Sequence, residues 1–349
     1  MSATNKQTKL KKLDPMPGDW KVKLINLCYK QATDNDRLVF SYLFNSLAKY
    51  GPKTDKAGNI IISKVTADNY PVFCAHIDTI HYWANNFKLF QYDIDGHNYL
   101  IARDGEKKHG IGGDDKCGVF ACLYLLETLE NVKIVFFTGE ETGCTGSYNI
   151  DMSEFEGARF ICSIDRWGNS DLISSYFGEK TISDKFKKEI APLLKKHSYK
   201  HTSGLITDCF TLMERGANVS CFNISCGYYS HHSNEEYIDT NELWDCCLLC
   251  EEIARTCDEV YEHKGRYNYK LSDSPVFEQW KLDRCPDEEL KGIISYIASE
   301  LGYTVDDMYF TACIKDIVDS VNDYLFDFEY KCITDYEIIK FRDGELIPF

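Results

Sequence analysis

The 349-residue sequence lacks several features that would each point to a broad class of protein. No apolar run approaches the roughly 20 residues that cross a bilayer, so the sequence predicts no membrane span. Residues 1–13 are polar and lysine-rich with no apolar segment behind them, which argues against a secretory signal. Positive charge is also in deficit: the net charge of -16 makes nucleic acid and anionic membranes poor partners and favours a site that concentrates cations.

Cysteine is abundant, with 16 residues scattered through the chain. Several lie in apolar segments, such as Phe73-Cys74-Ala75 and Ala121-Cys122-Leu123, and this pattern is typical of buried, reduced thiols. We therefore expect a cytoplasmic protein, because the cytosol keeps thiols reduced. The pair Cys247 and Cys250 lies on an apolar helical pattern and has no second Cys-x-x-Cys partner, so we interpret it as core packing.

Strand-like and helix-like segments alternate along the first 260 residues. Residues 86–109 resemble a hairpin with Asp95-Gly96 as its turn. The remaining strands are predicted at 60–62, 70–75, 134–137 and 160–165, and the helices at 20–50, 119–129, 183–196 and 241–261. This alternation predicts βαβ units, and hence an α/β fold: a three-layer α/β/α sandwich with a mostly parallel central sheet.

We divide the chain into three parts. Residues 1–18 are expected to form a disordered or extended tail, residues 19–267 the main domain, and residues 268–349 a small C-terminal α+β extension. In that extension the pattern predicts helices at 286–301 and 306–324 and a final hairpin.

The stretch from Ile134 to Ser147 is the most informative part of the sequence. Its predicted buried strand ends at Thr138-Gly139, and Glu140 and Glu141 follow directly. In open α/β sheets, ligands bind at the carboxyl ends of strands. Because neighbouring side chains on an extended segment point to opposite sides, one carboxylate can bind a metal while the other faces a water. Alone, such a pair is usually two solvated acids in a loop.

Five potential metal ligands lie just beyond predicted strands or in a glycine-rich turn. They are His76, Asp114, Glu141, Asp165 and His232. This mixture of imidazole and carboxylate suits zinc, and three carboxylates with one hydroxide would balance two Zn²⁺ ions. Asp78 is placed to accept the second N–H of His76 and fix its tautomer, which leaves Glu140 as the general base.

Each of these features has a simpler interpretation when taken alone. The His-x-Asp at 76–78 could be an accidental pair at the surface, and the Asp-Asp at 114–115 could cap a helix. The two histidines at 231–232 could lie in a solvated loop. The glycines of 110–113 complete neither a dinucleotide-binding nor a P-loop pattern. These interpretations do not explain the order His-x-Asp, Asp-Asp, Glu-Glu, Asp and His on successive elements of one domain.

This order resembles the co-catalytic di-zinc exopeptidases, the clan of tripeptide aminopeptidase, the carboxypeptidase G-like enzymes and the leucyl aminopeptidases. The resemblance covers about residues 20–262 and rests on six segments: Asp55-Lys-Ala-Gly-Asn59, Ala75-His-Ile-Asp-Thr79, Gly113-Asp-Asp-Lys116, Thr138-Gly-Glu-Glu-Thr-Gly143, Ser163-Ile-Asp165 and His232-Ser-Asn-Glu235. His232 is preferred over His231 because the segment after it is similar to the clan's His-Ser-x-x-Glu.

The resemblance implies a role for each ligand. Asp114 would bridge two zinc ions and be joined to Asp115 by a cis peptide bond. Glu141 and Asp165 would each bind one metal, and the two histidines would complete the site.

The same resemblance implies a metal-dependent hydrolase, an aminopeptidase of short peptides with two Zn²⁺ per chain, for which cobalt or manganese could substitute. Glu140 would take a proton from the attacking water and return it to the leaving amine. Two alternatives stay open: a deacylase of N-acyl amino acids or other small amides on the same site, and a non-catalytic binding protein on this fold.

Many members of that clan carry an inserted lid or dimerisation domain. The intervals 79–113 and 166–231 are too short for one. We therefore expect a single compact catalytic domain, with residues 268–349 bordering the cleft in place of the lid.

Overall fold

The computed structural model describes residues 13–264 apart from 32–36, 177–178 and 205–206, together with residue 294. The chain divides into two units, Met1–Tyr267 and Asn268–Phe349. Residues 1–12 of the expected N-terminal tail lie outside the described residues. So do the helices and the hairpin expected after residue 268, together with their expected position at the cleft.

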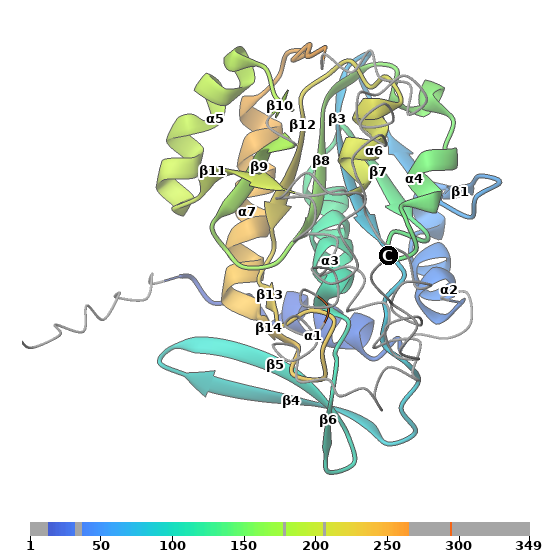
Figure 1. The fold of residues 1–349 in the computed structure, drawn as a ribbon, viewed down its shortest axis with the longest axis vertical. Helices are drawn as coiled ribbons and strands as arrows, with labels where there is room; N and C mark the ends of the chain where they lie inside the picture. Colours follow the sequence, from blue (N-terminus) through green and yellow to red (C-terminus); the bar gives the residue numbers. More distant parts are fainter. Residues whose placement is uncertain (1–12, 32–36, 177–178, 205–206, 265–293, 295–349) are drawn as a thin grey trace, which may run out of the picture. The chain divides into compact units, whose positions relative to one another are not determined.

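A nine-stranded sheet forms the centre of the first unit, in the order β1-β2-β7-β3-β8-β12-β9-β10 with β11 paired to β9 (Figure 1). The four central strands β7, β3, β8 and β12 are parallel to one another, as the sequence predicted, and the strands beside them are antiparallel. The strands are β1 Lys53–Thr54, β2 Ile60–Lys64, β3 Tyr70–His76, β7 Val132–Phe137, β8 Ala158–Arg166, β9 Asp171–Tyr176, β10 Glu179–Lys180, β11 Lys200–Gly204 and β12 Cys221–Ser225.

Both faces of this sheet are buried, which explains the continuous apolar runs in its central strands. Along β3, Phe73 and Ala75 belong to one apolar cluster, whereas Val72 and Cys74 belong to the other. Side chains of α1, α3, α5 and α7 contribute to the first cluster and those of α6 to the second, so helices cover both faces. The predicted three-layer α/β/α sandwich is therefore confirmed.

Seven α-helices are described, and several of them differ from the predicted helices in their bounds. The helices are α1 Gly18–Cys28, α2 Arg37–Ser46, α3 Gly113–Thr128, α4 Thr145–Asn149, α5 Asp184–His197, α6 Asp208–Glu214 and α7 Thr240–Thr256. The helix expected over 20–50 is two helices, followed by a short 3-10 helix at Ala48–Tyr50. Pro192 lies inside α5 without ending it. None of the described helices is long and apolar enough to cross a bilayer.

The last described helix, α7, ends at Thr256, although the pattern predicted a helix to residue 261. Beyond it the backbone turns to the main sheet: the N–H of Tyr261 donates to Arg159 O at 2.9 Å, and Tyr261 O accepts from the N–H of Ser220 at 2.8 Å. Tyr261 is thus joined by its backbone to β8 and to the residue before β12, and its side chain belongs to the first apolar cluster without being part of a helix.

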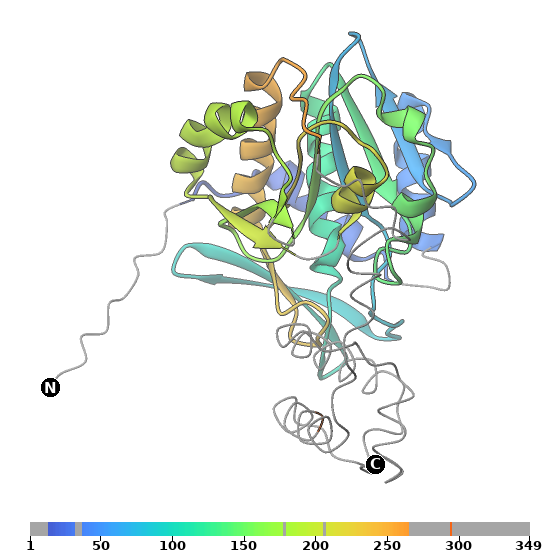
Figure 2. The ribbon, with the colours of Figure 1, turned by 45° about the horizontal axis from the view of Figure 1, so that its top comes forward.

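A second, five-stranded antiparallel sheet lies beside one end of the main sheet (Figures 1 and 2). Its strands are β4 Phe87–Ile94, β5 His97–Asp104, β6 Lys107–His109, β13 Tyr228–Tyr229 and β14 Tyr237–Asp239. The predicted hairpin forms its longest pair, and Asp95 and Gly96 adopt the positive φ values, 55° and 84°, that this tight turn requires. The segment before the two histidines of 231–232 contains β13, which pairs with β14, and β14 pairs with β5. Strands from the interval 79–113 and from this distant segment therefore form one sheet.

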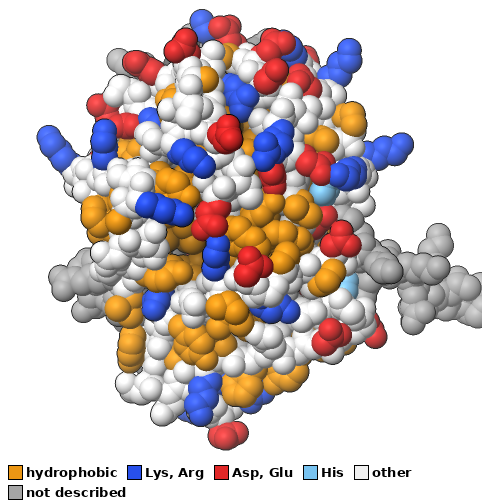
Figure 3. All heavy atoms as spheres, turned by 180° about the vertical axis from the view of Figure 1, so that it is seen from behind, with side chains coloured by type: hydrophobic (Ala, Val, Ile, Leu, Met, Phe, Trp, Pro, Cys, Tyr) orange, Lys and Arg blue, Asp and Glu red, His pale blue; other side chains and the backbone are white. Residues whose placement is uncertain are grey.

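Seen from behind, acidic and basic side chains are interspersed with apolar patches over the surface (Figure 3). The excess of carboxylates is thus not gathered into a single block on that face.

Candidate metal centre and active site

The five predicted ligands meet where the central parallel strands end. His76 is the last residue of β3, Glu141 follows β7, and Asp165 lies near the end of β8. Asp114 is the second residue of α3, and His232 follows β13. Four of them, all except His76, line a pocket of about 240 Å³ together with Glu140. The sheet therefore brings together residues that are up to 156 positions apart in the chain.

Asp114 lies between two histidine–carboxylate pairs. Its Oδ1 is 3.0 Å from Nε2 of His76, which is 3.6 Å from Oδ1 of Asp165. Its Oδ2 is 3.5 Å from Nε2 of His232, which is 2.9 Å from Oε2 of Glu141. Each oxygen of Asp114 thus faces a different pair.

The donor set fits divalent cations. Donor atoms of His76, Asp114 and Glu141 lie within 4.8 Å of one another, as do those of His76, Asp115 and Asp165. Burial and the neighbouring carboxylates raise the pKa of Asp114 to about 7. Bound positive charge would relieve this crowding of acids, and imidazole with carboxylate is a donor set that zinc accepts.

His76 is buried, with 1% of its surface exposed. Burial alone would lower its pKa, but Asp165, Asp114 and Asp78 together raise the pKa of His76 well above its usual value. By contrast, 48% of the His232 side chain is exposed, and Glu141 raises its pKa through a hydrogen bond.

Asp78 connects His76 to the Glu-Glu loop. Nδ1 of His76 lies 3.1 Å from the main-chain oxygen of Asp78 and 3.5 Å from its carboxylate. The same carboxylate accepts hydrogen bonds from the backbone N–H groups of Glu140, at 3.2 Å, and Glu141, at 3.0 Å. Burial raises the pKa of Asp78, but His76 and these two N–H groups outweigh that effect and hold it below its usual value.

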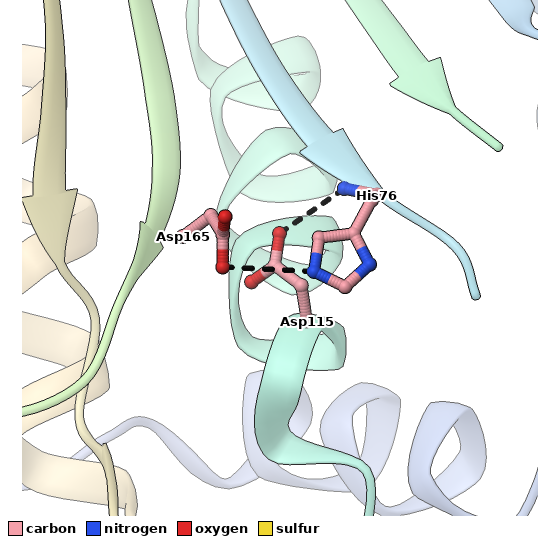
Figure 4. A group of neighbouring side chains, drawn as sticks. All are labelled: His76, Asp115 and Asp165. Atoms are coloured by element: carbon pink, nitrogen blue, oxygen red, sulfur yellow. Dashed lines mark hydrogen bonds and ion pairs between the residues drawn. The ribbon is translucent and has the colours of Figure 1, made fainter. Parts of the chain in front are cut away.

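The peptide bond between Asp114 and Asp115 is cis, as the family resemblance implied. The carboxylate of Asp115 is turned to the backbone: it accepts the N–H of His76 at 3.2 Å and that of Gly118 at 2.9 Å. Figure 4 shows Asp115 reaching the backbone of His76 while Asp165 faces the imidazole. A side chain at Gly118 would meet Asp115 and the carbonyl oxygen of Ile164 at 2.4 and 1.9 Å, so this close approach requires glycine.

Glu140 lines the pocket and is mostly enclosed. Burial is the main reason that the pKa of Glu140 rises to about 9, and Asp165, Asp208 and Asp114 add to the rise, against His76. A carboxyl group in this setting can hold a proton and release it, which is the property that a general base and acid requires.

Glu236, which was not predicted from the sequence, binds the backbone around Asp114. Its buried carboxylate accepts the backbone N–H of Gly112 at 2.6 Å and of Asp114 at 3.0 Å, and lies 2.8 Å from Nε2 of His81. Glu235, the residue included in the motif segment, is exposed and pairs with Lys108. The signal was present, because the spacing His-Ser-x-x-Glu counted from His232 ends at Glu236.

The Asp55–Asn59 segment supports the loop after β7. Asp55 accepts hydrogen bonds from the backbone of Ala57 and Asn59, both at 2.9 Å. The Asn59 side chain then accepts the N–H of Thr138 at 3.2 Å and donates to Gly146 O at 3.0 Å. This segment therefore fixes both ends of the loop that carries Glu140.

Two further histidines, His231 and His97, are not among the five ligands. The ring of His231 lies against Tyr228, with 5.9 Å between centroids, and burial lowers its pKa. A group outside the pocket contains His97, whose Nδ1 is 2.5 Å from Asp239, the N-cap of α7. Its third member, Glu242, accepts the hydroxyl of Tyr229 at 2.5 Å, so these hydrogen bonds fix the small sheet to α7.

A model of peptidase family M28 matches residues 59–247, more than half of the chain. A search of curated protein sequences found no match to this chain. Among solved structures, aminopeptidase PepT from Bacillus cereus has 14% identity and a TM-score of 0.51 over 69% of this chain and 98% of its own. A tripeptidase from Staphylococcus aureus has 13% identity and a TM-score of 0.55, over 68% and 97%. The TET1 peptidase of Pyrococcus horikoshii has 13% identity and a TM-score of 0.52, over 67% and 99%. At these identities the structural likenesses show the fold.

Proposed function

The chain belongs to peptidase family M28, and from this membership we propose that it is an aminopeptidase that acts on short peptides. Metal-dependent hydrolysis of peptide bonds follows from the family. Two considerations support the finer assignment. The pocket is small and rich in carboxylates, which suits a free amino terminus, and the proteins that share the fold include an aminopeptidase and a tripeptidase.

We propose that the site holds two zinc ions, with cobalt or manganese as substitutes. His76 and Asp165 would hold one, His232 and Glu141 the other, and Asp114 would be shared between them. The observation that carries this proposal is the position of Asp114, each of whose oxygens faces one histidine–carboxylate pair. When bound, the metal would supply Lewis acidity toward the scissile carbonyl and the attacking water.

Glu140 is the proposed base and acid. It would accept a proton from the attacking water and then deliver that proton to the leaving amine, so its carboxylate is restored after each turnover. Bound cations would lower its pKa, because nearby positive charge favours the carboxylate. Asp78 would position Glu140 through its backbone N–H and hold the imidazole of His76 in one orientation.

Metal analysis combined with a substrate panel tests the proposal. The purified full chain should bind about two equivalents of zinc and should hydrolyse aminoacyl amides and short peptides faster than N-acyl amino acids. Preferred hydrolysis of the N-acyl substrates would indicate a deacylase instead. A chain that takes up no metal on titration, or that hydrolyses neither class, would contradict the assignment.

The compartment is a further part of the proposal. Thirteen cysteines lie in the described part of the chain, and all are buried and free of disulfides. This supports a reducing, cytoplasmic location.

A further inference from the structure

Arg166 places positive charge in a pocket that is otherwise acidic. It follows Asp165 at the end of β8 and lines the same pocket as Asp114, Glu140 and Glu141. Among the described residues that line this pocket, it is the one arginine or lysine. The pocket therefore contains both charge signs.

Among the described residues, the guanidinium of Arg166 has a ring and an ion-pair partner but no hydrogen bond. It lies 4.8 Å from the ring centroid of Trp167, and its Nη2 is 3.6 Å from the carboxylate of Asp171, beyond hydrogen-bonding distance. Its Nε is enclosed and has no hydrogen-bond partner within the described part of the chain. A guanidinium carries five N–H donors, and a buried donor without a partner costs free energy.

Asp171 is shared between Arg166 and a second cation. The same carboxylate lies 3.9 Å from Nζ of Lys200, so two cations share one anion. The carboxylate of Asp171 is thus shared between two cations and does not fully neutralise Arg166.

We propose that Arg166 binds a carboxylate of the substrate, and this inference rests on the proposed peptidase function. The planar fork of arginine matches a carboxylate with two parallel hydrogen bonds, and the Trp167 ring lies against the guanidinium. The acidic side chains of the pocket are assigned to the metals and to proton transfer, so Arg166 would bind a negatively charged group of the substrate. The carboxylate belongs either to the C-terminus of a short peptide or to an acidic side chain.

Kinetics of the zinc-loaded full chain test the role of Arg166. Arg166→Met should lower kcat/KM for carboxylate-bearing substrates by about 10- to 100-fold, mainly through KM, as expected for a hydrogen bond to a charged group. Arg166→Lys should recover part of the loss, since it restores charge without the fork. Lys180→Met is the control: it removes an exposed cation that pairs with Asp184 outside the pocket, and it should leave kcat/KM unchanged.

Four substrates separate the two sources of carboxylate. A loss with Leu-Gly but not with Leu-Gly-amide or Glu-amide assigns the C-terminal carboxylate. A loss with Glu-amide but not with Leu-amide assigns an acidic side chain. An equal loss on all of them, Leu-amide included, or no loss on any, would overturn the proposal.

Equilibrium binding keeps this test independent of turnover. In zinc-loaded Glu140→Gln protein, Leu-Gly or Glu-amide should bind at least about tenfold more tightly than the matched uncharged ligand, and Arg166→Met should remove that preference. If the preference is present while the active chain hydrolyses no peptide, the peptidase assignment fails and the carboxylate site stands. Equal affinity for charged and uncharged ligands would contradict the site itself.

Discussion

Glu236 accepts the backbone N–H of Asp114 at 3.0 Å and so holds the residue that both histidines face. Glu236→Gln keeps the shape but replaces one acceptor oxygen by a donor. We expect zinc affinity to fall on the order of 10- to 100-fold, as for other residues that orient metal ligands. Competition with a chelator measures it. The adjacent, exposed Glu235→Gln is the control and should leave affinity unchanged; equal affinities for both variants would contradict the prediction.

Glu140 and Glu141 are neighbours with different predicted roles. Glu140→Gln should lower kcat by about 10²- to 10⁴-fold, because a general base is lost, while zinc content stays near that of the unaltered chain. Glu141→Ala should lose activity and bound zinc together. Metal analysis of both proteins after dialysis checks this, and identical metal content in the two variants would show that the roles are misassigned.

Gly118 allows α3 to approach β8 closely. Gly118→Ala should lower the free energy of unfolding by about 1–3 kcal/mol, because the added carbon meets the backbone of Ile164 and the carboxylate of Asp115. Urea unfolding of the metal-free protein measures the change. Gly18→Ala is a suitable control, since no atom lies within 4 Å of its added carbon. A Gly118→Ala protein as stable as this control would refute the packing argument.

Residues 268–349 remain predicted to border the cleft. If they do, removing them should change the relative kcat/KM for peptides of different length more than it changes zinc affinity, because a cover limits substrate length. Kinetics across di-, tri- and tetrapeptides, with zinc titration in parallel, test this. A folded, truncated protein with an unaltered length profile would leave the segment without a lid role.

Much of the fold and of the candidate site could be predicted because the informative residues lie at strand ends. The β-prone runs before His76, Glu140 and Asp165 mark buried strands, and the edge where such strands end is fixed by the parallel sheet. Glu236 escaped notice because the motif segment was ended one residue early, at Glu235, although the His-Ser-x-x-Glu spacing pointed to it. Its hydrogen bonds to the backbone N–H groups of Gly112 and Asp114 leave no trace in side-chain patterns.

Other elements depend on partners that are distant in sequence. β14 has three residues, too few for a periodic pattern, and exists because it pairs with β5. β9 and β11 contain polar residues such as Asp171 and Lys200, which obscure a strand pattern. These two strands form because they pair with each other at the side of the main sheet. Arg166 likewise lines the pocket because it is the last residue of β8. The residues next to it in the chain do not predict this position.

The pairing of β14 with β5 has a consequence for how the chain tolerates change in length. The loop that carries His232 and Glu236 is anchored at both ends by β13 and β14, and these strands reach the rest of the small sheet through β5. A segment between His76 and Asp114 in sequence thus fixes the last ligand, more than 120 residues later. We expect insertions at the exposed turn of Asp95 and Gly96 to be tolerated, whereas deleting the hairpin should release His232, because β14 would lose its partner strand β5. We therefore expect this hairpin to accept added residues at its turn but not to be dispensable for the site.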